Sequence, residues 1–204
     1  MNWLAHTLLS KKNIEYQLGN VLADPMKGKV WKDANDHLKQ GMKMHKAIDK
    51  FTDQHQLISA SKKRLGEDGH LKGVVLDLLY DHFLSINWSQ FCRWELDTYL
   101  AYFNGAANQA ASFYPPKPQQ IVKRMVESNL LGRYRTFVEL LTALERIDLR
   151  LSDRAKKKET ASQYIDAIES QYTALENDFM VFFPELIQVF KTHPLGSATY
   201  HYLY

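Results

Sequence analysis

Apolar residues recur three or four positions apart along most of the chain, and no stretch sustains the apolar and polar alternation that is typical of a strand. Residues 26–114 contain no proline, so long helices can form there. The pattern predicts an all-α, single-domain helical bundle. Helices are expected over residues 3–10, 14–23, 33–52, 71–88, 95–112, 119–131, 133–151 and 159–184, with a turn or extended connector at 114–118.

Two of the expected helices carry polar side chains on their apolar faces. His45 and Asp49 lie on the apolar stripe of the third expected helix, and Asp77 and Asp81 lie on that of the fourth. A spacing of four residues places both members of a pair on one helix face, about 6 Å apart along the axis. Each pair is therefore predicted to point toward the interior.

Two further polar residues join this set: His6, in the first expected helix, and Asp24, which precedes Pro25 at the end of the second. Acids and imidazoles that project inward from several helices are how helical folds build metal sites, and mixed oxygen and nitrogen ligands suit Mg²⁺ or Mn²⁺. Each residue alone has a structural alternative, as a helix cap or as the partner of an arginine or lysine. Taken together, they favour a divalent cation, because unpaired buried carboxylates are costly.

Composition narrows the class of protein. The chain has 204 residues, a formal net charge of +3 and 12% aromatic residues, values that exclude a disordered chain. The single cysteine, Cys92, excludes an internal disulfide framework. Neither a signal peptide nor a membrane-spanning run is visible in the sequence, so we expect a cytoplasmic protein that does not enter the membrane. One helical domain is expected over residues 1–190, followed by an aromatic tail at 191–204.

Charge is unevenly distributed along the second half. Residues 117–158 hold 11 Lys and Arg against 5 Asp and Glu, whereas residues 159–190 hold 6 acids and no Lys or Arg. A basic face of this kind can steer an acidic partner toward the protein. Because the acidic segment compensates for it, the charge falls short of what nucleic-acid binding requires.

Several motifs in order along the chain carry a family resemblance. They are MNWLAH at the start, GNVLAD ending at Asp24, GMKMHKAIDKFTD at 41–53 and LDLLYDHFLSINW at 76–88, followed more weakly by LLGRYR at 130–135 and YTALENDFMVFFP at 172–184. Together they resemble the acyl carrier protein phosphodiesterase family.

The resemblance implies a helical fold related, in distorted form, to the HD-type metal-dependent phosphohydrolases. The adjacent His-Asp pair of the usual HD signature does not occur here. Its nearest substitutes are His45 with Asp49 and the reversed pair Asp81-His82.

The resemblance also implies an activity. Family members hydrolyse the phosphodiester that joins 4′-phosphopantetheine to a serine of holo acyl carrier protein, with Mn²⁺ or Mg²⁺ required. The implied metal ligands are Asp24, His45, Asp49, Asp77 and Asp81. His6 would lie in or beside the metal centre, and His6 or His82 would protonate the departing serine oxygen.

Carrier proteins are small and strongly acidic, so a cognate enzyme is expected to have a basic docking face. Arg133 and Arg135, in the LLGRYR motif, are the predicted contact residues, and the face is extended by Arg124, Arg146, Arg150, Arg154 and Lys156 to Lys158. Two alternatives remain at this point: a phosphohydrolase that acts on a nucleotide or another small phosphoester, and a non-catalytic module that binds carrier protein.

Overall fold

Helices make up nearly all of the regular structure in the computed structural model, which describes residues 3–204. Ten α-helices and three short 3-10 helices occur in this range, and extended pairing there is limited to one isolated bridge between Cys92 and Leu203. The all-α prediction is confirmed. No helix of the described part is both long and apolar enough to cross a bilayer.

The α-helices are α1 (Trp3–Leu8), α2 (Ile14–Leu22), α3 (Asp36–Gln54), α4 (Gln56–Arg64), α5 (Lys72–Ile86), α6 (Leu96–Ala111), α7 (Pro116–Glu127), α8 (Phe137–Arg150), α9 (Asp153–Lys156) and α10 (Ile165–Thr192). The 3-10 helices are η1 (Trp88–Gln90), η2 (Leu130–Gly132) and η3 (Ser162–Tyr164).

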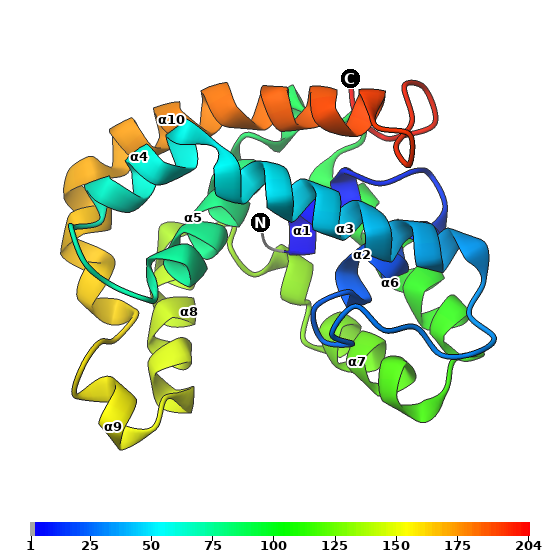
Figure 1. The fold of residues 1–204 in the computed structure, drawn as a ribbon, viewed down its shortest axis with the longest axis horizontal. Helices are drawn as coiled ribbons and strands as arrows, with labels where there is room; N and C mark the ends of the chain where they lie inside the picture. Colours follow the sequence, from blue (N-terminus) through cyan, green and yellow to red (C-terminus); the bar gives the residue numbers. More distant parts are fainter. Residues whose placement is uncertain (1–2) are drawn as a thin grey trace.

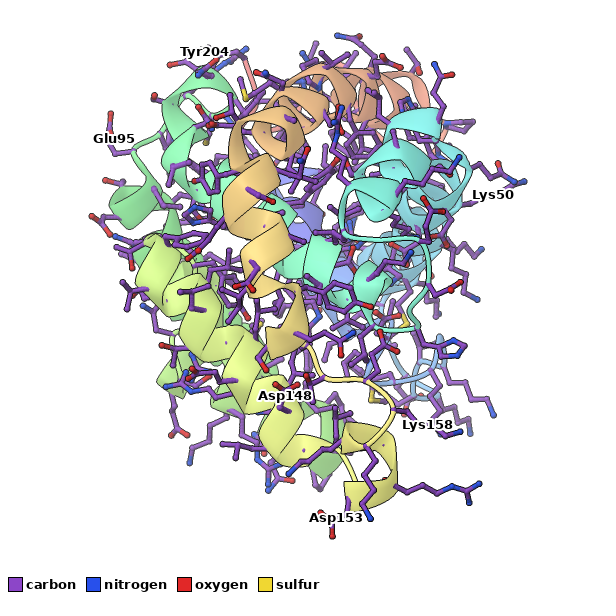
Figure 2. All side chains as sticks on the ribbon, turned by 90° about the vertical axis from the view of Figure 1, so that its left-hand side faces the viewer. Lys50, Glu95, Asp148, Asp153, Lys158 and Tyr204 are labelled. Atoms are coloured by element: carbon purple, nitrogen blue, oxygen red, sulfur yellow. The ribbon has the colours of Figure 1, made fainter. Side chains whose placement is uncertain are left out.

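The helices form an arch (Figure 1). α3 and α10 run along its upper side, α8 and α9 descend at one end, and α7 lies at the other. Seen from the side, α9 forms the lower tip, beside the labelled residues Asp153 and Lys158 (Figure 2). The core beneath α10 is rich in aromatic side chains, among them the buried Phe179, Phe182 and Phe183.

α2 and α3 form the most extensive helix pair, and glycine makes their approach possible. A Cβ on Gly41 would lie 2.0 Å from the carbonyl oxygen of Tyr16, and a Cβ on Gly19 would lie 2.1 Å from that of Leu38. No side chain fits at either position. The two helices are thereby held backbone to backbone, and both lead to the polar residues singled out from the sequence.

Prolines behave differently from the prediction at two places. Pro116 and Pro118 belong to the first turn of α7, where a missing N–H leaves no hydrogen bond unmade, so the expected connector is shorter than 114–118. Pro184 lies inside α10, which was expected to stop there. Buried residues on both sides of it, Phe183 and Leu186 among them, hold the helix across the lost bond.

α8 begins at Phe137 rather than at 133. Thr136 starts it with a capping box, in which its side chain accepts from the Glu139 backbone N–H and the Glu139 carboxylate accepts from the Thr136 N–H. The preceding residues form η2 and a loop. α4 and α9 were not predicted.

The aromatic end of the chain packs onto the body. The backbone N–H of Arg93 donates to the Tyr202 carbonyl, and that of Tyr204 donates to the Phe91 carbonyl. Leu203 is fully buried between them.

Candidate metal centre

The candidate site is built from the ends and faces of α1, α2 and α3. Asn side chains cap the starts of the last two helices: Asn13 accepts from the Tyr16 N–H, and Asn35 accepts from the Leu38 N–H. α3 then carries His45 and Asp49 four residues apart on its inner face. The turn after α2 presents Asp24 to this face.

Three of the predicted residues, His6, His45 and Asp49, offer ligand atoms that all lie within 4.8 Å of one another. His45 Nε2 lies 2.9 Å from Asp49 Oδ2 and 3.0 Å from Asp24 Oδ1, and His6 Nε2 lies 3.2 Å from Asp49 Oδ1. The two imidazoles stack with ring centroids 4.1 Å apart. The structure thus brings together residues from three separate helices and turns.

The tautomer of His6 follows from its neighbours. The amide nitrogen of Asn20 donates to the carbonyl oxygens of His6 and Leu9, so the Asn20 Oδ1 is an acceptor. That oxygen lies 2.8 Å from His6 Nδ1, which must therefore carry the proton. His6 is fully buried, and burial lowers its pKa, which favours the neutral ring. Its Nε2 then presents a lone pair toward the Asp49 carboxylate.

Two lone-pair donors that face each other at this distance repel unless a proton or a metal cation is shared between them. His6 Nε2 is buried without a hydrogen-bond partner, and so is His45 Nδ1. A neutral imidazole nitrogen and a carboxylate oxygen are the donors that Mn²⁺, Mg²⁺ and related ions accept. The residues present therefore fit a divalent cation.

The short distances between these side chains also shift their pKa values. A hydrogen bond from His45 lowers the pKa of Asp24. Burial raises the pKa of Asp49, but the hydrogen bond from His45, together with the proximity of His6, outweighs it and leaves that pKa below its ordinary value. For His45, burial lowers the pKa, whereas the bonds to Asp24 and Asp49 prevail and raise it to about 9. Both carboxylates are therefore ionised at neutral pH, and a cation that binds them would take the place of the proton on His45 Nε2.

Two cavities flank the cluster, and both are lined by Asp24 and Asp49. One, of about 170 Å³, is also lined by Asp77 and Lys62. The other, of about 310 Å³, lies next to His45 and is lined by Lys27, Gly28 and Lys46. Space for a small anionic group thus adjoins the candidate metal ligands.

The three lysines were not singled out from the sequence. Lys62 comes from α4, which the sequence did not predict, and passes close to α5, where a Cβ on Gly73 would lie 4.0 Å from Lys62 Nζ. Lys27 adopts a positive φ of 53°, as does Gly28 at 66°, so the turn after Asp24 is tight. Surface lysines are common in the chain, and nothing in their spacing marks these three.

Asp77 and Asp81 lie in different surroundings. Asp77 lines the smaller cavity beside Asp24 and Asp49. Asp81 is buried, and its two oxygens accept from the backbone N–H groups of Leu4 and Ala5, at the start of α1. The structure brings Asp77 to the site and uses Asp81 to hold the helix that carries His6.

His82 lies away from the metal cluster. Its Nδ1 is 2.8 Å from the carbonyl oxygen of Tyr134, and its Nε2 is 2.7 Å from the hydroxyl of Tyr172. Burial lowers the pKa of His82, which keeps the ring neutral, with Nδ1 donating and Nε2 accepting. These contacts fasten the loop before α8 to α5 and α10.

The two arginines of the LLGRYR motif face different environments. Arg133 donates through Nε to the Ser128 carbonyl and lines a groove beside α7 and α8. Arg135 forms an ion pair with the exposed Asp97 of α6.

Comparisons with known proteins agree over nearly the whole chain. A family described as acyl carrier protein phosphodiesterase matches residues 1–186. A protein of that name from Pectobacterium atrosepticum is 28% identical over 200 residues, which cover 96% of this chain and all of the relative. One from Serratia proteamaculans is 28% identical over 203 residues, again 96% of this chain and all of the relative. One from Escherichia coli O6:H1 is 27% identical over 193 residues, or 92% and 96% of the two chains. No solved structure gives a significant match.

Proposed function

The chain belongs to the acyl carrier protein phosphodiesterase family, and from this premise we propose that it is a metal-dependent hydrolase of holo acyl carrier protein. The reaction adds the oxygen of water to phosphorus and breaks the bond from phosphorus to the serine oxygen, which takes up a proton. The products are apo acyl carrier protein and 4′-phosphopantetheine. The observation that carries the proposal is the cluster of His6, His45 and Asp49, whose ligand atoms lie within 4.8 Å of one another and in which the unpartnered Nε2 of His6 is directed at Asp49.

We assign His6, His45 and Asp49 as ligands of Mn²⁺ or Mg²⁺, with Asp24 and Asp77, on the cavity walls, as the further ligands. The chemistry that a divalent cation supplies at such a site is acidification of water and neutralisation of charge on phosphate oxygens. Asp81 is left out of the ligand set because backbone amides occupy both of its oxygens.

Other residues of the chain act on the substrate or hold parts of the protein in place. The ammonium groups of Lys62, Lys27 and Lys46 line the two cavities, where they would offset the negative charge of the phosphodiester. Asn20 keeps His6 in the tautomer that leaves Nε2 free of a proton. His82 has a positioning role, because both of its nitrogens are bonded to tyrosines rather than directed at a cavity.

The test is mass spectrometry of holo acyl carrier protein incubated with the purified protein and Mn²⁺. Loss of the 4′-phosphopantetheine mass is expected, and a chelator should prevent it. Hydrolysis of nucleotides without this loss would instead identify a phosphohydrolase of small phosphoesters. Binding of carrier protein with no hydrolysis of either substrate would identify a non-catalytic module.

A further inference from the structure

A basic groove runs between α7, η2 and α8. Two adjoining cavities of about 510 and 350 Å³ form it, and Trp3, Leu130, Arg133 and Arg150 line both. Figure 1 places α7 and α8 on the two sides of the arch, with α1 between them and α5 directly above α8. We name this surface the arginine groove.

Four guanidinium groups border the groove: Arg124 from α7, Arg133 from the loop after η2, and Arg146 and Arg150 from α8. None of the four forms an ion pair with a carboxylate of the described residues. Like charges gathered in this way repel one another and attract a negatively charged partner.

Two acids line the groove against the four arginines, so they offset only half of its positive charge, and both also contact other groups. Glu127 Oε1 lies 3.7 Å from Lys123 Nζ, one turn earlier on the same face of α7. Glu139 is held by the backbone and hydroxyl of Thr136, in the capping box of α8. The groove is therefore positive overall.

Its floor is apolar. Ile121 and Met125 contribute from α7, Ala143 and Ile147 from α8, and Leu78 and Val74 from α5. Val74 is 45% exposed although it lies on a face otherwise turned toward the protein. A partner that fills the groove thus needs an apolar stripe flanked by acidic side chains, which is the surface of an acidic amphipathic helix.

We propose that the arginine groove is the docking site for an acidic amphipathic helix of the carrier protein, an inference that rests on the proposed function. Arginine supports the assignment, since its planar fork pairs well with carboxylates at an interface. The four arginines would engage the acidic flanks of the helix, and the floor would bury its apolar stripe.

The position of the groove suits delivery of the prosthetic group. Trp3 lies in the groove, and His6 follows it by one turn of α1. On α5, Val74 and Leu78 face the groove, whereas Gly73 and Asp77 line the cavity beside the metal cluster. The groove and the cavity thus lie on neighbouring faces of α5, so a flexible arm has to pass only around that helix.

The test reverses two charges of the groove in the variant R146E/R150E. The affinity for apo acyl carrier protein, which lacks the prosthetic group, is measured by calorimetric titration with a chelator present. Both arginines are exposed on α8, so the fold should survive, as circular dichroism will verify. We expect the Kd to rise at least about 10-fold, while kcat for holo carrier protein at saturation stays close to that of the wild type and KM rises.

The matched control is K157E/K158E, which makes the same change in net charge. These lysines lie beside α9, where Figure 2 shows Lys158 at the lower tip, and they line neither cavity of the groove. A second variant, Val74→Asp, keeps all four arginines but places an acid on the floor, and it should also weaken binding.

The outcomes separate the two proposals. Equal losses of affinity in R146E/R150E and in the control would show a general charge effect and overturn the groove. If the wild type hydrolyses holo carrier protein and R146E/R150E binds apo carrier protein with unaltered affinity, the groove is not the docking site, but the proposed function stands. Groove-dependent binding of apo carrier protein without any hydrolysis would support the groove and refute the enzyme.

Discussion

At the scale of single residues, Asp49 is the most connected member of the candidate metal centre. Its two oxygens reach His6 and His45, on different helices. We expect Asp49→Asn to lower the affinity for Mn²⁺ by at least about 100-fold, because one anionic ligand is lost. Titration calorimetry on the purified variant measures this, with Asp36→Asn, exposed in the first turn of α3, as control. Unaltered affinity would remove Asp49 from the ligand set.

Lys62 allows a separate test of the smaller cavity. It is proposed to face the phosphodiester without binding the cation. Lys62→Met should therefore reduce kcat/KM for holo carrier protein by roughly 10- to 100-fold and leave Mn²⁺ affinity unaltered. The matched control is Lys63→Met, its exposed neighbour on α4. Equal losses in both variants would contradict the assignment.

Asp81 predicts a pH dependence of stability. Burial raises its pKa to about 7, despite the bonds from the amides of Leu4 and Ala5. The folded protein then binds more protons than the unfolded chain between about pH 4 and pH 7, so this residue's contribution is fully present below that range and is lost as the pH rises through it. Asp81→Asn removes the titration and keeps one acceptor oxygen for the two amides.

The measurement is urea unfolding of both proteins from pH 4 to 8. As the pH rises across this range, we expect the free energy of unfolding of the wild type to fall by on the order of 3 kcal/mol relative to that of Asp81→Asn. A constant difference between the two proteins would show that Asp81 does not titrate there.

The residue scale also shows what the sequence can and cannot predict. The spacing of His45 and Asp49 placed both on one helix face, and their contact is local. Asp81 and His82 carry the same signal of polar groups on a buried helix, yet their partners are backbone groups at positions 4, 5 and 134. Backbone partners leave no trace in side-chain spacing, so structural and ligating acids look alike in the sequence.

At the scale of elements, the contact between α2 and α3 sets the geometry of the site. Gly41 has no room for a side chain, because its Cβ would meet the Tyr16 carbonyl at 2.0 Å. Gly41→Ala should therefore push the helices apart and destabilise the protein by about 1–3 kcal/mol or more. The displacement should also separate Asp24 from His45 and lower Mn²⁺ affinity.

Gly105 offers the matched control, since it lies in α6 with nothing within 4 Å of its Cβ position. Gly105→Ala is expected to raise stability by about 0.5–1 kcal/mol and to leave the metal affinity unaltered. Thermal unfolding and calorimetry of both variants test the pair. Similar stabilities would mean that α2 and α3 tolerate a wider separation.

Local rules alone did not settle the helix boundaries at the prolines. The prolines at positions 116 and 118 occupy the helix start that local rules favour for this residue, but the sequence does not tell such a start from a connector. Pro184 ends a helix by local rules and fails to do so here, because Phe183 and its neighbours are buried in the core. Tertiary packing overrides local preference where the buried apolar area is large.

At the scale of the whole molecule, the end of the chain helps to close the core. Leu203 is fully buried, beside its bridge to Cys92. Leu203→Ala should lower the free energy of unfolding by about 2–4 kcal/mol, from lost burial and the resulting cavity. Val138→Ala, at a position 71% exposed on α8, should change it little. Equal effects in urea unfolding would contradict the structural role of the chain end.

The arginine groove belongs to this scale too. The sequence assigned Arg124, Arg146 and Arg150 to the same basic face as Arg133 and Arg135, but it did not indicate that Arg135 would pair with Asp97 while the other four border a groove. That selection depends on where the ends of α7 and α8 lie in space. A count of charged residues along the sequence gives their number, whereas docking depends on their positions in space.

The bonds from Asp81 to the start of α1 also bear on the order in which the chain assembles. His45 and Asp49 belong to one helix, so that pair exists as soon as α3 forms. His6 is held in place by an acid 77 residues beyond Leu4, and this long loop closes only when α5 docks. A chain emerging from the ribosome would thus hold the pair of His45 and Asp49 before His6 is fixed in place. Metal supplied during synthesis would therefore meet a weaker site than metal supplied afterwards.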